Sequence, residues 1–195
     1  MRPSINALKG YNFQGSIYCY LLCLMDLERE IIELDAEISI DNNFDDIFVK
    51  TCDDSFYLQV KNYKDITFDK IAINGKKIDI EGHSSILIGN KKGYDNNILI
   101  IRNLEIPKEK INSKIFGMDC IKFDNCYILG WFDKECNQLV KALYDNEERY
   151  NNILLTVDEK LNTGNFNFTI HDLPPLNVFE QKLQEETKII RNFSL

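Results

Sequence analysis

The sequence predicts an α/β fold: one apolar helix, then a meander of antiparallel strands, a mixed sheet and a helical C-terminal part. Two patterns support this prediction. Apolar residues recur at helical spacing from Tyr11 to about Leu27, with Gly10 at the expected start of the helix. The segments that follow alternate between apolar and polar residues with the period of two that is typical of strands. A chain of 195 residues can bury a sizeable core and usually forms one domain.

Three strands are expected directly after the helix, in residues 31–40, 42–50 and 55–62. The connections between them are short and polar. Strands joined in this way most simply pair with their neighbours in the chain, so the sequence predicts an antiparallel meander.

A second group of strands is expected further along the chain. Residues 71–80 indicate a hairpin, because Asn74-Gly75 supplies a positive-φ turn between two alternating arms. Residues 84–89 and 96–106 have the composition of further strands. The apolar run Asn97–Ile101 favours a buried, central position in the sheet.

The change in character near Pro107 predicts the division of the chain. We expect an α/β core in residues 1–106, a mainly helical extension packed on it in 107–175, and a C-terminal amphipathic helix in 176–195. That last helix is a candidate linker to a partner or to a further domain. Helices are expected within the extension in residues 107–117, 133–144 and 146–161, followed by an extended segment that ends at Pro174-Pro175.

The charge of the chain limits the classes of function. The net charge is −8 and the sequence pI is about 4.9. A protein that coats nucleic acid without selectivity needs a basic surface, so that class is disfavoured. Nucleases that hold magnesium with clustered carboxylates carry negative charge of their own, but they then need a local basic strip or a partner that supplies one.

The sequence favours a cytoplasmic location and no association with a membrane. No apolar run approaches the length that crosses a bilayer, and the N-terminus lacks the pattern of a secretory signal. The six cysteines form no C-x-x-C pair, which argues against a zinc site and favours reduced thiols. Cys19 and Cys23 are expected to be small core residues of the first helix.

The strand at residues 55–62 carries the candidate chemistry. Gln59 and Lys61 lie two residues apart, so both side chains emerge from one face of the strand, opposite Leu58 and Val60. A neighbouring antiparallel strand can bring Asp46 beside them. An acid, an amide oxygen and a cation are the groups that a magnesium-dependent phosphodiester hydrolase uses. The alternative is a half-buried strand whose polar face lies in water, preceded by an ordinary polar turn.

Several short motifs together resemble the PD-(D/E)xK nuclease superfamily. They are "GYNFQG" at 10–15, an acid before "FDDI", and "YLQVK", which places Gln59 thirteen positions after Asp46. The closest likeness is to the branch with Q-x-K in the last motif. This branch supplies the double-strand DNA endonuclease effectors of bacterial anti-phage systems of the CBASS, Lamassu and STAND-NTPase types. The resemblance implies a restriction-endonuclease-like core and covers residues 10–63.

The resemblance also implies roles for individual residues. Asp46 and Gln59 correspond to the magnesium ligands, with manganese as a substitute ion, and Lys61 corresponds to the catalytic cation. Gln14 and, more loosely, Glu37 or Asp41 are the expected supporting residues. Double-stranded DNA is the implied substrate. The implied partner is a protein such as an ATPase or sensor subunit, or a second copy of the chain.

A second hypothesis is a catalytically silent adaptor that keeps the nuclease-like fold and binds a partner ATPase or sensor protein. It is motivated by the acidic net charge, by the imperfect fit of Glu37 and Asp41 to the first acidic position of the nuclease motifs, and by the amphipathic C-terminal segments. Metal-dependent stabilisation that requires Asp46 separates the two hypotheses.

Overall fold

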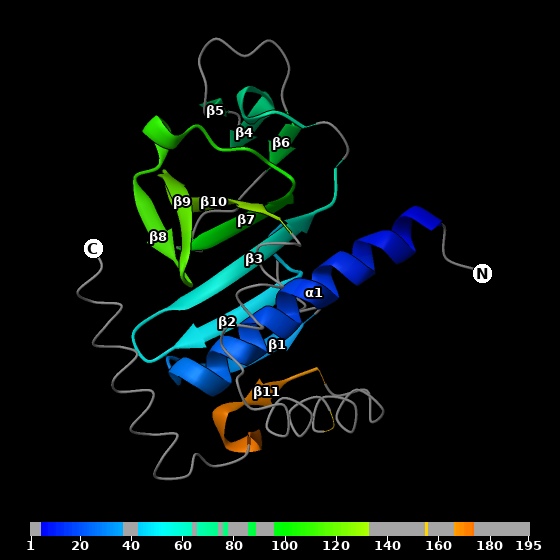
Figure 1. The fold of residues 1–195 in the computed structure, drawn as a ribbon, viewed down its shortest axis with the longest axis vertical. Coiled ribbons are helices and arrows are strands. Elements are labelled where there is room, and N and C mark those ends of the chain that lie inside the picture. The colour runs from blue at the N-terminus through cyan, green and yellow to red at the C-terminus, as the bar shows by residue number, and fades with distance from the viewer. Residues whose placement is uncertain are drawn as a thin grey trace.

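A mixed sheet of eight strands forms the centre of the molecule, and one long helix lies along it (Figure 1). The computed structural model describes residues 5–36, 43–63, 66–73, 76–77, 86–88, 96–132, 155 and 166–173. Within these residues the strand order of the large sheet is β11-β1-β2-β3-β7-β10-β9-β8, and a small sheet has the order β5-β4-β6. The predicted α/β class with a mixed sheet is therefore confirmed.

Helix α1 (Ile5–Glu28) confirms the predicted N-terminal helix but is longer than expected. It begins at Ile5, so Gly10 lies inside it and does not mark its start. Arg29 follows the last turn with φ of 54°, the left-handed conformation that commonly ends a helix. The Arg29 guanidinium also binds back to Asp26, with Nε 2.9 Å from the Asp26 carbonyl oxygen.

The predicted antiparallel meander is confirmed by β1 (Ile31–Ala36), β2 (Ile47–Thr51) and β3 (Ser55–Lys61). In the register of β2 and β3, Ile47 lies opposite Leu58. The two strands form a tight antiparallel pair, which brings the beginning of β2 next to the end of β3.

Strand β7 (Asn97–Arg102) is central, as predicted, and runs parallel to β3 on one side and to β10 on the other. Every side chain from Asn97 to Ile101 is buried. Parallel strands covered on both faces carry such continuous apolar runs. The carboxyl ends of β3, β7 and β10 therefore meet at one edge of the sheet, and β2 begins at this same edge.

The short helix predicted for residues 107–117 is wrong. A single 3-10 turn, Lys108–Lys110, is followed by strands β8 (Ser113–Ile115), β9 (Met118–Phe123) and β10 (Cys126–Trp131). Phe116 and Gly117 both have positive φ, 49° and 76°, which forms a tight two-residue hairpin between β8 and β9. The chain reverses at Phe116 and Gly117, so the residues on either side pair as antiparallel strands and do not form the expected helix.

Strands β8, β9 and β10 belong to the same sheet as β3 and β7. The division of the chain into a core, an extension and a C-terminal helix stays a prediction. The helices expected in 133–144, 146–161 and 176–195 lie outside the described residues, apart from Leu155.

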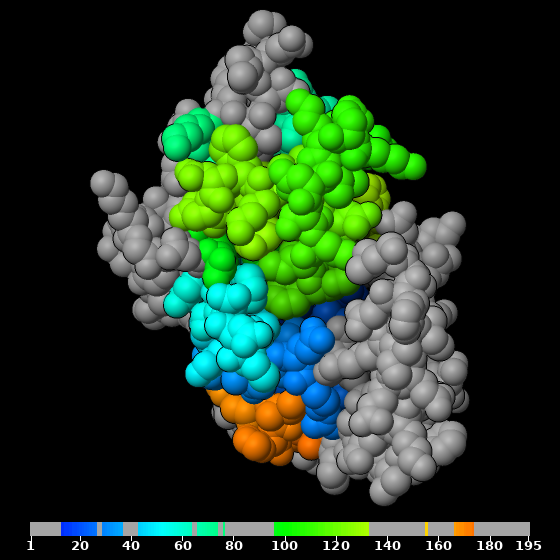
Figure 2. Space-filling view, turned by 90° about the vertical axis from the view of Figure 1, so that its left-hand side faces the viewer, coloured from blue at the N-terminus to red at the C-terminus, as the bar shows by residue number. Residues whose placement is uncertain are grey.

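The remaining strands are short. The hairpin predicted at 71–80 is confirmed by the antiparallel pairing of β4 (Ile71–Ile73) with β5 (Lys76–Lys77), while its turn lies outside the described residues. Strand β6 (Ile86–Ile88) is also confirmed and pairs in parallel with β4. In the extended segment expected before the two prolines, β11 (Phe168–Thr169) pairs with β1. Figure 2 shows residues 166–173 lying against the surface formed by the first strands.

Two apolar cores lie on the two faces of the large sheet. In the first, Ile17, Leu21 and Met25 of α1 pack against Leu58 and other residues of β1–β3, β7 and β10. The second core joins the opposite face of β7, β9 and β10 to the small sheet and to the turn Phe68–Lys70. The sheet is thus covered on both sides near the end of β3.

The exposure of α1 corrects one expectation and supports another. Cys19 is exposed and is not a core residue, whereas Cys23 is buried as predicted.

In the described part of the chain no helix has the length and apolar character needed to span a membrane.

Candidate metal centre

The alternation predicted for β3 directs Gln59 away from α1. Leu58 and Val60 belong to the first core, whereas the neighbouring Tyr57 packs on the second. Gln59 is only 5% exposed. The alternative reading, in which the polar face of β3 lies in water, is therefore wrong for Gln59. The second core covers the face from which Gln59 emerges.

Asp46 lies directly before β2 and its carboxylate turns toward β3. The side-chain amide of Gln59 donates a hydrogen bond to Oδ2 of Asp46. The backbone N–H of Val60 donates a second hydrogen bond to the same oxygen, at 2.7 Å. The structure thus brings together the acid and the amide that the sequence singles out, across the ends of two neighbouring strands.

The pairing of the strands explains why the Val60 amide is available. The backbone of Leu58 faces β2, because its carbonyl accepts a bond of 3.1 Å from the N–H of Asp46. Alternate residues of a strand direct their backbone groups to the same side, so the Val60 amide also faces β2. The regular pairing of β2 ends at Ile47, and the carboxylate of Asp46 supplies the acceptor that β2 no longer provides.

Lys61 follows Gln59 on the same face of β3. Its side chain is partly buried, and its register partner on β7 is Ile101, a residue of the second core. No ion pair of Lys61 occurs among the described residues, but its charge lies close enough to Asp46 to lower the pKa of that carboxyl. The three residues proposed for catalysis thus share one edge and one face of the sheet.

The pKa of Asp46 is raised above its ordinary value, and burial is the largest cause. The hydrogen bond from Val60, the charge of Lys61 and the hydrogen bond from Gln59 each lower this pKa. The negative charge of Asp45 raises it further. The favourable contacts therefore compensate the buried negative charge only in part, and an additional cation at this position would be stabilising.

Gln14 connects α1 to this site. Its side-chain amide donates a hydrogen bond of 2.9 Å to the backbone carbonyl of Asp46. Phe44 is fully buried in the second core and anchors the chain two residues before Asp46. Both contacts fix the backbone from which the carboxylate extends. Glu37 and Asp41, the other expected supporting residues, lie outside the described residues.

The donor set can be compared with the needs of a magnesium ion. Magnesium is commonly held by one or two protein oxygens together with water and substrate phosphate. Asp46 offers a carboxylate, and Gln59 directs its amide NH2 group toward it, so the Gln59 side chain would have to turn its oxygen toward a bound ion to complete this pattern. A richer cluster is not seen: the described residues contain no group of three or more His, Cys, Asp or Glu side chains arranged to hold a metal.

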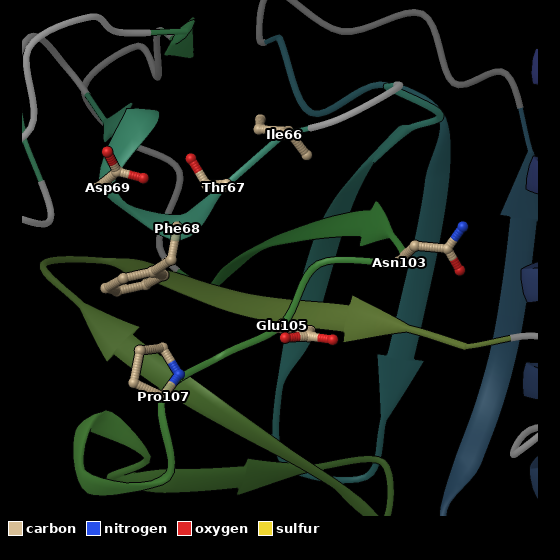
Figure 3. A pocket seen from close by; sticks show the side chains of 7 residues that line it. All are labelled: Ile66, Thr67, Phe68, Asp69, Asn103, Glu105 and Pro107. Carbon is tan, nitrogen blue, oxygen red and sulfur yellow. The ribbon is translucent and has the colours of Figure 1, made fainter.

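A cavity that the sequence does not indicate opens at the same edge of the sheet. Its volume is about 400 Å³, and Figure 3 shows Phe68 and Pro107 on one side and Asn103 on another. The full lining is Ile66, Thr67, Phe68, Asp69, Asn103, Glu105 and Pro107. Ligands in sheets with parallel strands often bind beyond the carboxyl ends of those strands. The sequence feature that could have indicated this cavity is the group of polar residues, including Asn103 and Glu105, that follows the buried run Asn97–Ile101.

No family model matches the chain, and comparison with curated proteins and with solved structures found no match.

Proposed function

We propose that the protein is a magnesium-dependent DNA endonuclease whose centre contains Asp46, Gln59 and Lys61. The observation that carries the proposal is the contact of the Asp46 carboxylate with Gln59. Lys61 lies next to this pair, on the same face of β3. The resemblance to Q-x-K nucleases, stated above from the motifs, names the same three residues.

The chemistry assigned to each residue follows from its position. Bound magnesium supplies Lewis-acid polarisation of the phosphate and lowers the pKa of a coordinated water. Asp46, directly before β2, and Gln59, on β3, would supply the carboxylate and amide oxygens that hold the ion. Lys61 supplies a positive charge that stabilises the developing negative charge on the phosphate oxygens. Gln14 holds the Asp46 backbone through its bond of 2.9 Å and so fixes the direction of the carboxylate.

The biological context is part of the proposal. The resemblance favours an effector of bacterial anti-phage defence in the cytoplasm that acts on double-stranded DNA. The net charge of −8 opposes the approach of a polyanion. We therefore expect efficient cleavage to require assembly, either with an ATPase or sensor subunit or with further copies of the chain.

Cleavage of supercoiled plasmid DNA in the presence of magnesium tests the proposal. Lys61→Ala should reduce the cleavage rate by at least about a hundredfold, because the residue stabilises transition-state charge. Lys50→Ala is the matched control, since Lys50 is an exposed lysine on β2, toward the opposite end of the β2–β3 pair. Equal cleavage by the parent and Lys61→Ala, with the candidate partner present, contradicts the assignment.

One observation favours the silent adaptor as a second candidate. Both hydrogen bonds to the Asp46 carboxylate described above go to Oδ2, and one of them satisfies the backbone amide of Val60. A carboxylate that caps a strand amide has a structural reason to be present without any metal. Under this reading magnesium does not stabilise the protein, and Asp46→Asn does not change its response to the ion.

A further inference from the structure

The cavity beyond β7 lies beside the proposed centre. Lys61 is the register partner of Ile101, and Asn103 follows two residues later. With a strand separation near 4.8 Å and two rises along the strand, the Cα atoms of Lys61 and Asn103 are about 8 Å apart. Ile66 and Phe68 of the lining belong to the second core, which covers the face from which Lys61 emerges.

The lining has one apolar side and several polar groups. Ile66 and Phe68 are buried, so together with Pro107 they form a fixed apolar wall. Asn103 and Glu105 are exposed. No hydrogen bond or ion pair of either side chain is seen among the described residues, so their hydrogen-bonding capacity is available to a ligand. Such a combination of a flat apolar surface with a few polar groups is typical of small-ligand pockets.

The hydrogen-bonding groups select the kind of ligand. The carboxylates of Glu105 and Asp69 only accept hydrogen bonds when ionised, while the Asn103 amide both donates and accepts. A matching ligand is flat, partly apolar and rich in N–H donors along one edge. Adenine, cytosine and guanine have this character because each carries an exocyclic amino group, whereas thymine presents two carbonyls and a single N–H.

The residues around the cavity add a basic rim. Lys70 follows Asp69 in one 3-10 turn, and Lys108 and Lys110 flank the exposed Glu109 in the other, directly after Pro107. Lys110 lies nearest the apolar wall, with its Nζ 6.0 Å from the centroid of the Phe68 ring, where it can contact the sugar-phosphate backbone of a bound nucleotide. The rim offsets the negative charge of the interior and favours a nucleotide over a free amine.

We propose that this cavity binds an unpaired nucleobase with an exocyclic amino group, taken from the DNA next to the phosphate held by the proposed centre. The inference rests on the proposed nuclease function and extends it to the structure of the substrate. The base is unstacked from its neighbours, enters against the wall of Phe68 and Pro107, and is read by Asn103 and Glu105.

The test measures the binding of duplexes that each contain one unpaired position, by fluorescence anisotropy and without divalent ions so that no cleavage occurs. The unpaired position carries adenine, cytosine, guanine, thymine or an abasic sugar. The parent should bind the three amino-bearing bases roughly tenfold more tightly than the abasic duplex. Thymine should bind more tightly than the abasic site but less tightly than the amino-bearing bases, because it gains the apolar contact with Phe68 and Pro107 without the matching hydrogen bonds. Equal binding of all five duplexes overturns the inference.

Two variants report on the lining without disturbing the fold. Asn103 has φ of 57°, so Asn103→Gly removes the amide at a position where glycine is comfortable. Glu105→Gln keeps the shape of an exposed side chain and removes its charge. Each should reduce the preference for amino-bearing bases several-fold and leave abasic binding unchanged. Asp124→Asn, which removes a negative charge from an exposed turn outside the cavity, should keep the preference.

Failure of this inference is distinguishable from failure of the nuclease proposal. Plasmid cleavage that depends on Lys61, together with equal binding of all duplexes, overturns the base pocket alone. A clear base preference, together with no plasmid cleavage in the presence of the candidate partner, overturns the nuclease proposal and supports the pocket. If arginine amide, but not a nucleoside, shifts the NMR signal of the Asn103 side chain, the cavity accepts a basic side chain of a protein and the inference is overturned.

Discussion

The Asp46 carboxylate accepts a hydrogen bond of 2.7 Å from the backbone amide of Val60, fourteen residues later in the chain. This contact joins the beginning of β2 to the end of β3 and places the acid beside Gln59. It combines two roles, because the same oxygen completes the pairing of a strand and belongs to the candidate metal centre.

Replacing Asp46 with Asn should change how stability depends on pH. The raised pKa of Asp46 means that the folded protein binds this proton more tightly than the unfolded chain. Stability is therefore highest below the ordinary pKa of an aspartate and falls as the pH rises through the raised value. Asp46→Asn keeps an acceptor for the Val60 amide but does not titrate, so it should gain stability relative to the parent as the pH rises.

Urea denaturation between pH 4 and pH 8 measures this difference. Asp119→Asn on the exposed face of β9 is the control, and its profile should follow that of the parent. Parallel profiles for Asp46→Asn and the parent contradict the assignment of a destabilising buried charge to this residue.

Replacing Gln59 with Glu should make stability depend strongly on magnesium. Two carboxylates in contact repel each other, so the variant should melt at a lower temperature than the parent when no metal is present. A divalent ion that binds only the folded state then stabilises it, by about 2.7 kcal/mol at a hundredfold excess over Kd. Thermal melts with increasing magnesium measure the effect.

Gln59→Leu is the control for this experiment, because it removes the amide oxygen and adds no charge. It should lose the response to magnesium, and it should also lower stability by about 1–3 kcal/mol because Asp46 loses a buried hydrogen bond. A response to magnesium that is the same in Gln59→Glu, Gln59→Leu and the parent excludes metal binding at this position.

Gln14 should matter for both stability and the proposed activity. Gln14→Ala removes the bond between α1 and the Asp46 carbonyl, which should cost about 1 kcal/mol of unfolding free energy. Gln14→Glu places a carboxylate against that carbonyl and should be worse at neutral pH, but should recover at acidic pH as the carboxyl becomes a donor. Denaturation at pH 4.5 and pH 7.5 distinguishes the variants, and an identical loss at both pH values argues against this contact.

Gly130 should tolerate no side chain. A Cβ atom at this position of β10 would overlap the carbonyl of Leu104, the residue between Asn103 and Glu105 of the cavity. Gly130→Ala should therefore cost about 1–3 kcal/mol and displace the cavity wall. Gly15→Ala, where nothing lies within 4 Å of the added atom, is the matched control and should be neutral or stabilising. An unchanged melting temperature for Gly130→Ala contradicts the described packing of β10 on this segment.

Much of the local structure could be predicted from the sequence because local spacing specifies it. The apolar repeat of α1, the alternation in β3 and the apolar run of β7 each satisfy a periodicity that reads directly from neighbouring residues. The same alternation placed Gln59 and Lys61 on one face. The hairpin at Phe116-Gly117 was missed because its turn lacks the Asn-Gly or Asp-Gly pair that usually marks such turns.

The tertiary structure alone decided which segments become neighbours. Strand β7 pairs with β3 across an interval of 35 residues and with β10 on its other side, and no local pattern specifies that choice. The burial of Gln59 and the cavity at Asn103 follow from this pairing, whereas the capping of the Val60 amide by Asp46 follows from the point at which the pairing of β2 with β3 ends. Local periodicity fixes which face a side chain takes, whereas the burial of both faces of the sheet fixes what that side chain meets.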